Sequence, residues 1–422
     1  MTNGLINSTL EKIASNEKKS IISGPFGSSI SKKYFKEEGI PVIRGNNLSL
    51  NGEKFIDDGF VFVTDEKARE LNCYAKCDDL VFTAVGTIGQ VGIITSDLDY
   101  NEYVISNKQL RVRLDANKIL PLYAFYWFSS KWIQKLIKQR NVGSTVPLIN
   151  LTVLRQLTIW YPESLNKQYS AVNILENLNK KIELNNKINA ELEATAKLIY
   201  DYWFVQFDFP DENGKPYKSS GGKMVYNEEL KREIPEGWEM NFLTDEMDLQ
   251  YGFPFSTKLF NSEKKGVPVV RIRDIQNCTI SNYSTEEVDN KYKINSGDVL
   301  VGMDGNFHIN YWNKENCYLN QRCLRIRSND DSISEIQARY SIEPYLKARE
   351  KNVSRTTVAH LSARDVNDLK VIKANRIVQN KANSFFKSNL EKIVTNRKEN
   401  EKLAELRDWL LPMLMNGQVT VN

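Results

Sequence analysis

The segment Gly39-Ile-Pro-Val-Ile-Arg44 occurs a second time, 227 residues further along the chain, as Gly266-Val-Pro-Val-Val-Arg271. A second pair keeps the same order, since Leu110-Arg-Val-Arg113 returns as Leu324-Arg-Ile-Arg327 after 214 residues. The loops between these segments have therefore changed in length while their order has not. A repeat of this length is far longer than a solenoid unit of about 20–50 residues. The sequence thus predicts two homologous domains.

A heptad pattern follows each repeat, beginning at Lys181-Ile182 and again at Lys392-Ile393. Steps of three and four residues alternate in both, which is typical of paired helices. Buried Asn residues at matching positions penalise wrong registers. In an antiparallel pair we expect Asn185 to face Asn400 and Asn189 to face Asn396. The alternative is two surface helices with polar positions by accident. The predicted seam comprises Ile182, Asn185, Asn189, Leu192, Ile393, Asn396, Asn400 and Leu403.

The predicted fold class is α+β, with two homologous mixed α/β domains separated by two long antiparallel coiled-coil helices in a pseudo-twofold arrangement. Short β-type runs bounded by Gly, Asp or Asn support the mixed domains. The first long helix is expected over about 166–203, and the second over about 378–411, ending before Pro412. The predicted parts are domains 1–163 and 234–375, helical segments 164–206 and 376–422, and a Pro/Gly/Ser-rich linker 207–233.

Composition describes a folded protein, with 422 residues, 41% hydrophobic and 26% charged. No run of about 18 apolar residues is present, and the first residues do not form a secretory signal. Five cysteines do not make a disulfide framework for so long a chain, so we expect a reducing cytoplasm. The net charge is only +4, so a nucleic-acid surface would need its basic groups concentrated on one face.

Catalytic patterns are missing. Two histidines leave little for a His-centred acid–base mechanism, and there is no G-x-x-x-x-G-K-[ST] phosphate loop. Cys73 and Cys77 have no matching ligand pair nearby, so we expect no metal. The chain also lacks the Asn-Pro-Pro-aromatic tetrapeptide of adenine methyltransferases. We therefore expect a binding protein without catalytic residues or a cofactor of its own.

Several short segments, taken in order, resemble one known family, the specificity (S) subunits of type I DNA restriction–modification systems. They are Gly24-Pro-Phe-Gly-Ser28, the turn Gly143-Ser-Thr145, Tyr202-Trp-Phe204, Phe207-Asp-Phe-Pro210, Ile234-Pro-Glu-Gly-Trp238 and Leu406-Arg-Asp-Trp-Leu-Leu-Pro-Met413. The resemblance covers nearly the whole chain. It implies two target-recognition domains, each reading one half of a bipartite, asymmetric double-stranded DNA target.

The resemblance also implies partners. The two helices would set the gap between the half-sites and dock two modification (methyltransferase) subunits, which bring S-adenosylmethionine chemistry. Two restriction subunits with ATP- and Mg-dependent translocase and nuclease activity would complete the complex. Two other classes remain open at this point. One is a self-contained DNA methyltransferase or nuclease, and the other is a coiled-coil adaptor with two protein-binding domains.

Candidate DNA-binding residues lie in matching loops of the two repeats. Arg44 and Arg271 follow short strands, and Arg and Asn make the favoured bidentate contacts to guanine and adenine. Ser, Thr and basic residues in neighbouring loops suit phosphates. Turn caps or a solvated basic face are the alternative interpretation. The predicted set is Lys32, Arg44, Asn46, Asn47, Thr87, Asn107, Gln109, Arg140, Ser144, Thr145, Lys258, Arg271, Arg273, Asn306, Gln321, Arg322, Ser354, Arg355 and Thr356.

Overall fold

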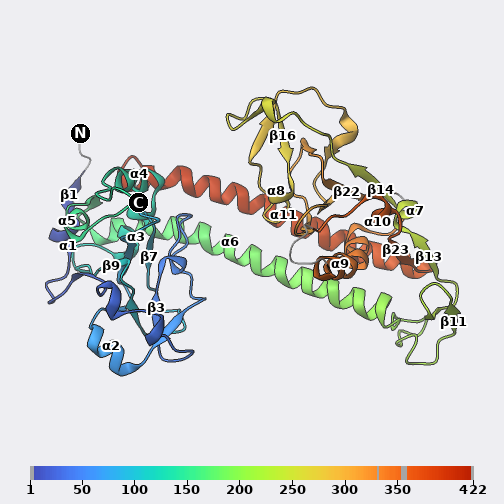
Figure 1. Ribbon diagram of the computed structural model, residues 1–422, viewed down its shortest axis with the longest axis horizontal. Coiled ribbons are helices and arrows are strands. Elements are labelled where there is room, and N and C mark those ends of the chain that lie inside the picture. The colour runs from blue at the N-terminus through green and yellow to red at the C-terminus, as the bar shows by residue number, and fades with distance from the viewer. Residues whose placement is uncertain (1–3, 330–331, 353–358, 420–422) are drawn as a thin grey trace. The chain divides into compact units, whose positions relative to one another are not determined.

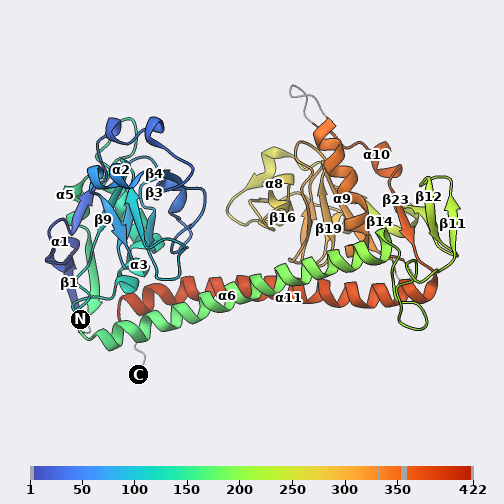
Figure 2. The same cartoon turned by 90° about the horizontal axis from the view of Figure 1, so that it is seen from below.

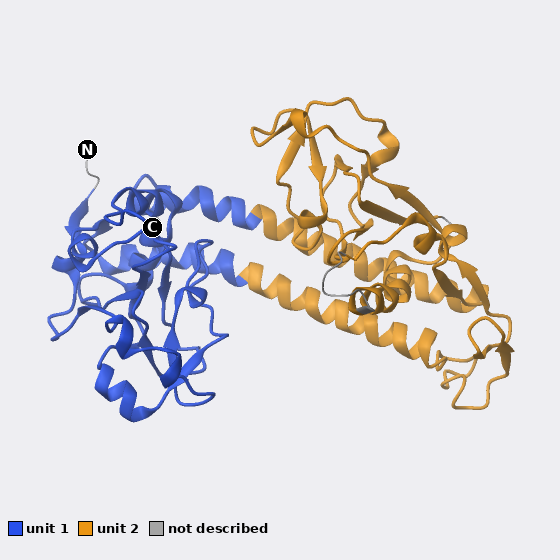
Figure 3. Ribbon diagram, in the orientation of Figure 1, with its two compact units in different colours: residues 1–180, 403–422 blue, residues 181–402 orange. Residues whose placement is uncertain are grey.

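The structure is a computed structural model, and it describes residues 4–329, 332–352 and 359–419. The chain divides into two units (Figure 3). Unit 1 contains residues 1–180 and 403–422, and unit 2 contains residues 181–402. Unit 1 is therefore assembled from both ends of the chain. The candidate residues Ser354, Arg355 and Thr356 lie outside the described residues.

Unit 1 contains two four-stranded sheets and one strand pair (Figure 1). The first sheet has the order β2 (Ile21–Ser23), β9 (Gln109–Val112), β6 (Leu80–Thr83), β7 (Val91–Ile93). The second has the order β4 (Val61–Val63), β3 (Ile40–Ile43), β8 (Glu102–Ile105), β5 (Tyr74–Lys76). The remaining pair is β1 (Leu5–Thr9) with β10 (Thr158–Pro162), and the short helices are α1 (Leu10–Ile13), α2 (Asp65–Leu71), α3 (Pro121–Ser129), α4 (Lys131–Gln139) and α5 (Leu151–Arg155).

The first sheet of unit 1 packs on α3. All four residues of β6 are buried, as expected for a short run of apolar residues between two other strands. The rings of Phe82 on β6 and Phe128 on α3 meet edge to face with their centroids 5.5 Å apart. Leu414 and Met415, from the far end of the chain, belong to the same core.

Unit 2 repeats the two sheets with modifications. Its first sheet has the order β14 (Met247–Tyr251), β22 (Cys323–Ser328), β19 (Val299–Gly302), β20 (Ile309–Tyr311). Its second has the order β15 (Phe260–Asn261), β17 (Asn282–Ser284), β16 (Val267–Val270), β21 (Cys317–Leu319), β18 (Lys293–Ile294). The remaining elements are the pairs β13 (Glu239–Phe242) with β23 (Lys370–Lys373) and β11 (Met224–Asn227) with β12 (Arg232–Pro235), and helices α7 (Leu243–Glu246), α8 (Ile272–Ile275), α9 (Glu335–Asn352) and α10 (Ala363–Asn367).

The two quoted repeat segments occupy the same place in each unit. Val42 on β3 pairs in parallel with Val104 on β8, and Val269 on β16 pairs in parallel with Tyr318 on β21. Each repeat segment thus supplies a central strand, and each ends at an arginine. The prediction of two homologous mixed domains is confirmed at the level of strand pairing.

The long helices are α6 (Leu165–Tyr200), which continues into a π-helical turn (Asp201–Val205), and α11 (Arg376–Met415). The predicted end before Pro412 is wrong, because Pro412 lies inside the last turns of α11. A proline removes one backbone donor and the bond that it would make. Here the helix continues nevertheless and delivers Leu414 and Met415 to the core of unit 1.

Within unit 2 the two helices lie side by side, as both views show (Figures 1 and 2). Asn185 Nδ2 donates to Asn400 Oδ1 at 2.9 Å. Asn396 Nδ2 donates to Asn189 Oδ1 at 2.9 Å. Asn189 Nδ2 also donates to the carbonyl of Ile393 at 3.2 Å, so its buried amide is bonded at both ends. These are the two amide pairs that the antiparallel heptad alignment predicts.

The other seam residues are less enclosed. Ile393 is buried, whereas the remaining apolar members are half-buried: Ile182, Leu192 and Leu403. In the described part of the chain, no helix combines the length and the apolar character needed to cross a membrane.

Candidate nucleic-acid interface

Polar side chains from four segments of unit 1 line one hollow of about 450 Å³. The segments are the end of β3, the 3-10 turn Gly45–Asn47, the loop after β6 and the turn before β9. The structure therefore brings together side chains separated by as many as 65 residues in the chain. Five of the predicted DNA-binding residues line this hollow: Arg44, Asn46, Thr87, Asn107 and Gln109.

One backbone carbonyl, that of Gly59, accepts hydrogen bonds from both Arg44 and Asn46. Arg44 Nη2 donates to the carbonyl of Gly59 at 2.8 Å, and Asn46 Nδ2 donates to the same oxygen at 3.3 Å. This shared anchor limits how far either side chain can move. Guanidinium and amide groups held in this way suit readout of base edges, because bidentate contacts require fixed orientation.

Asn47 requires a correction. It is fully buried, its Oδ1 accepts from the Arg44 backbone N–H at 2.9 Å, and its Nδ2 donates to the carbonyls of Ile56 and Asp58, both at 2.9 Å. No edge of its amide remains for DNA, so Asn47 shapes the turn that presents Arg44. Gln109 is also buried and bonds to Ser106, so it forms a wall of the hollow.

The other unit 1 candidates lie outside the lining of this hollow. Lys32 is in a 3-10 turn, Arg140 directly follows α4, and Ser144 and Thr145 lie in the loop after it. All four are exposed. Their suitability for phosphates stays a prediction.

In unit 2 the candidate arginines are held by side chains. Arg271 Nη1 and Arg273 Nη2 donate to one acceptor, Asn282 Oδ1, at 3.3 and 2.7 Å. Lys258 and Gln321 are exposed. Asn306 lines a different hollow of about 630 Å³. Charged residues from three helices also line it, among them Glu193, Arg339 and Arg397. The unit 2 candidates thus do not converge on one hollow as those of unit 1 do.

A shared backbone frame shows which positions correspond. In unit 1 the loop after β6 is tied to two other segments by three backbone hydrogen bonds of 2.7–2.9 Å, and unit 2 has the same three at 2.8–2.9 Å. The side chains at the centre of this frame differ between the units. In unit 1 the three bonds run from Ala84 N to Lys108 O, from Gly86 N to Pro147 O and from Ile149 N to Ala84 O. In unit 2 the corresponding bonds run, in the same order, from Met303 N to Arg322 O, from Gly305 N to Ala359 O and from Leu361 N to Met303 O.

An isolated bridge completes the correspondence. Val85 bridges to Leu148 in unit 1, and Asp304 bridges to His360 in unit 2. The apolar pair of unit 1 is therefore replaced by an acid and an imidazole. Arg322 takes the place of Lys108 beside this pair.

The three unit 2 side chains contact one another. His360 Nδ1 lies 2.5 Å from Asp304 Oδ1, and Arg322 Nη1 lies 3.4 Å from His360 Nε2. Arg322 Nε lies 3.5 Å from Asp304 Oδ2. We call Asp304, Arg322 and His360 the unit 2 triad. Neither Asp304 nor His360 is among the predicted DNA-binding residues. The equivalent places of the loops 83–87 and 303–307 in the two repeats were the available signal for Asp304.

Two further features were not predicted from the sequence. Phe26, in the first segment of the family resemblance, is 90% exposed, although a large aromatic side chain usually has some cover. Cys323 occupies the position of Gln109, and burial raises the pKa of its thiol to about 12. The thiol therefore stays protonated and neutral, so this wall of the site is less polar in unit 2.

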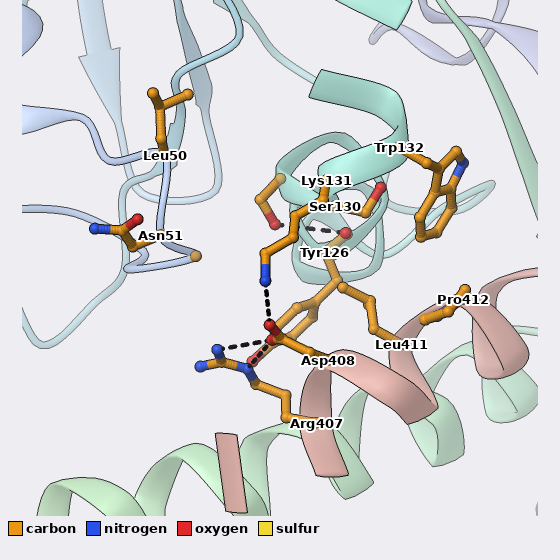
Figure 4. Close-up of a pocket in the computed structure, with 12 residues that line it drawn as sticks. Leu50, Asn51, Tyr126, Ser130, Lys131, Trp132, Arg407, Asp408, Leu411 and Pro412 are labelled. Atoms are coloured by element: carbon orange, nitrogen blue, oxygen red, sulfur yellow. Dashed lines mark hydrogen bonds and ion pairs between the residues drawn. The ribbon is translucent and has the colours of Figure 1, made fainter. Parts of the chain in front are cut away.

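A second hollow in unit 1, of about 530 Å³, is mainly apolar (Figure 4). Tyr126, Trp132 and Leu411 contribute to its lining. Lys131 Nζ lies 2.6 Å from Asp408 Oδ2 at its edge. Burial raises the pKa of Asp408, but hydrogen bonds from Lys131 and Arg407 outweigh that effect and keep the pKa below its usual value. The residues that line this hollow differ from those that line the polar one.

The duplicated frame with diverged polar side chains defines a class of protein, a two-part recognition protein with α/β units. The sequence model of one family, described as "Type I restriction modification DNA specificity domain", matches the chain twice, at residues 25–194 and 235–404. These matches cover most of the chain, and the protein belongs to this family.

Among the described residues, no group of three or more His, Cys, Asp or Glu side chains is arranged to hold a metal ion.

Named relatives agree with the family. The type I restriction enzyme MjaIX specificity subunit of Methanocaldococcus jannaschii is 25% identical over 412 residues, which cover 95% of this chain and 91% of the relative. The HindI specificity subunit of Haemophilus influenzae is 23% identical and covers 94% and 98%. A crystal structure of a type I S subunit from M. genitalium matches with a TM-score of 0.54 at 16% identity, covering 97% and 96%, which shows a shared fold.

Proposed function

We propose that this DNA specificity subunit reads a bipartite target, with unit 1 contacting one half and unit 2 the other. The observation that carries the proposal is the backbone frame that both units share, with different polar side chains at equivalent positions. Base edges in the major groove are distinguished by the donors and acceptors placed against them. Two frames with different side chains therefore favour two different half-sites, and hence an asymmetric target.

The long helices are the proposed spacer and docking surface. Each of α6 and α11 contributes residues to both units. Apolar side chains remain exposed on them, including Leu184, Ile188 and Leu198 in unit 2 and Leu406 and Trp409 in unit 1. Exposed apolar groups in series favour a protein partner. We assign this surface, together with the apolar hollow beside Asp408, to two modification subunits.

The chemistry is assigned to the partners. Modification subunits would supply S-adenosylmethionine-dependent methyl transfer, and two restriction subunits would supply ATP- and Mg-dependent translocation and cleavage. The chain itself would bind no cofactor. The competing proposals are a self-contained methyltransferase or nuclease and an adaptor that binds only proteins.

One experiment separates these proposals. Purified chain, with and without the modification subunit of the same system, is incubated with labelled S-adenosylmethionine and a library of duplex DNA. We expect methyl transfer only with the partner present, and only on duplexes that share a bipartite motif. Methyl transfer by the chain alone would identify an enzyme instead. Binding to the partner without selection among DNA sequences would identify an adaptor.

A second experiment tests the spacer. Four residues inserted after Ile188 add one helical turn, about 6 Å of length and roughly 40° of rotation. We expect the recognised gap to lengthen while both half-sites stay the same. An unchanged gap would show that these helices do not set the spacing.

A further inference from the structure

We infer that Arg322 reads a guanine in the half-site bound by unit 2, and that Asp304 and His360 are the residues that position it. The inference rests on the proposed function, because it assumes that unit 2 faces DNA. It goes further in naming the base, the reading group and its supports.

The hydrogen-bond partners assign the two ring nitrogens of His360. A guanidinium group can only donate, so the His360 Nε2 that faces Arg322 Nη1 at 3.4 Å is assigned as an acceptor. Nδ1 then carries a proton and donates it to Asp304 Oδ1 at 2.5 Å. The second oxygen of Asp304 lies 3.5 Å from Arg322 Nε. Arg322 is thus held at two of its three nitrogens.

Among the described residues, Arg322 Nη2 makes no hydrogen bond or ion pair. Nη1 faces His360 Nε2, and Nε forms an ion pair with Asp304 Oδ2. The outer hydrogens of Nη1 and Nη2 form the fork that matches guanine O6 and N7. The Arg322 side chain is 56% exposed, so this edge can reach a ligand in solvent.

The support beneath the triad is rigid. Asp304 and His360 lie opposite each other in a backbone bridge, and hydrogen bonds of 2.9 and 2.8 Å flank it on both sides. Arg349 Nε also donates to the carbonyl of His360 at 3.1 Å. Arg322 itself has a φ of 66°, a left-handed conformation that residues other than glycine rarely adopt. Such a conformation is retained where the surrounding structure enforces it, and it is frequent at binding sites.

A purely structural role explains the triad less well. Ion pairs between exposed side chains add little to stability, and the Arg322–Asp304 pair is both exposed and long, at 3.5 Å. Unit 1 keeps the same backbone frame with Lys108, Val85 and Leu148 at the three positions. The frame therefore does not need the triad, and a role in recognition accounts for the change at all three positions.

The test uses the full chain in complex with its modification subunits. Duplexes with both half-sites randomised are selected for binding, and the selected sequences are compared between variants. Arg322→Ala should make one guanine in one half-site degenerate, and the triple variant Asp304→Val with Arg322→Lys and His360→Leu should weaken the preference for that guanine, because its lysine lacks polar support. We expect discrimination at that position to fall by about 10-fold to 100-fold, the range for loss of one bidentate contact. The other half-site should not change.

Further variants test the positioning residues. His360→Leu should weaken the guanine preference, whereas His360→Gln should restore much of it, because a glutamine amide can both accept from Arg322 and donate to Asp304. A residue that only stabilised the fold would show no such rescue in base preference. Lys347→Ala, on an exposed residue of α9, removes one positive charge from unit 2 and should leave the guanine preference intact.

The outcomes are distinguishable. If the unmodified complex selects no bipartite sequence, the proposed function itself fails. If it selects one and Arg322→Ala keeps every guanine preference, only the present inference is overturned. An equal loss of affinity for all sequences would overturn it too, since that is the behaviour of a phosphate contact. The triple variant copies the set found in unit 1. If it does not fold, as judged by circular dichroism, Arg322→Ala alone decides.

Discussion

Unit 1 and unit 2 share the strand order of their first sheet, yet the polar side chains around that sheet are arranged differently. The order β2-β9-β6-β7 in unit 1 corresponds to β14-β22-β19-β20 in unit 2. Around this common sheet, unit 1 gathers amide and hydroxyl side chains on one hollow, whereas unit 2 displays separately held arginines. The difference shows that backbone hydrogen bonds preserve the frame, while side chains on it can be exchanged. Recognition can thus diverge between duplicated units without a change of fold.

The same contrast appears in the buried charges. In unit 1, Asp79 is completely buried and serves two arginines, with Arg113 bound through 2.8 Å contacts to both its oxygens and Arg111 at 3.7 Å. The hydrogen bonds to Asp79 raise the pKa of Arg113. In unit 2 the two equivalent arginines bond to different acids: Arg327 bonds to Asp298 at 2.6 Å, and Arg325 bonds to Asp248. In unit 1 one buried acid thus contacts both arginines, with the exposed Glu17 as a second partner of Arg113 at 2.7 Å, whereas in unit 2 each arginine bonds to an acid of its own.

The largest expected effect concerns these acids. Asp79→Ala leaves the buried Arg111 without its carboxylate and Arg113 with only the exposed Glu17, and removing one partner of a buried pair costs about 3–5 kcal/mol. Asp298→Ala should cost less, because Arg325 keeps Asp248 and Arg327 is 30% exposed. Urea titration measures the loss of stability in each variant. Hydrogen exchange, resolved peptide by peptide, then assigns the loss of protection to one unit. Equal losses for the two variants would contradict the division of charge described above.

A second prediction concerns the joining of the chain ends in unit 1. Leu414 is 3% exposed within the core of unit 1, and Tyr123 Oη donates to the carbonyl of Met415 at 3.3 Å. Leu414→Ala should destabilise unit 1 by about 2–5 kcal/mol, the usual range for a buried leucine. Hydrogen exchange should show the loss in peptides before residue 180 and leave the sheets of unit 2 protected. Trp409→Ala, on the same helix but 57% exposed, is the matched control and should change stability little.

The sequence was sufficient to predict the features that depend on periodicity and repetition. The heptad steps placed Asn185 and Asn189 correctly against Asn400 and Asn396, because register in a helix pair follows from spacing. The repeat likewise located the loops around Arg44. Pro412 was misread, because a local rule about proline gives no weight to the core that the end of the helix enters.

Side-chain roles were harder to predict. Asn47 and Asn46 are neighbours of the same type, yet one is buried with every donor bonded and the other lines the hollow. Only the path of the backbone distinguishes them. His360 and Asp304 are 56 residues apart, and the bridge that joins them is a tertiary contact with no local pattern. Residues that meet only through a tertiary contact can be identified only from the three-dimensional structure.

The smallest expected effect, and the sharpest comparison, is the reciprocal exchange. Val85→Asp, Lys108→Arg and Leu148→His together place the unit 2 triad on the frame of unit 1. The backbone hydrogen bonds correspond, although residue 108 lacks the positive φ of Arg322, and the new arginine should add a guanine preference of about 10-fold at one position of the other half-site. Selection from the randomised duplex library measures it.

One single variant is the control for this exchange. Lys108→Arg alone should give a weaker preference, since Val85 and Leu148 offer the guanidinium no polar support. If the single and triple variants behave alike, then positioning by the acid and the imidazole contributes nothing, and an exposed arginine is sufficient. If the triple variant gains no preference although it folds, the units do not present equivalent faces to DNA. The match between their frames would then be a property of folding alone.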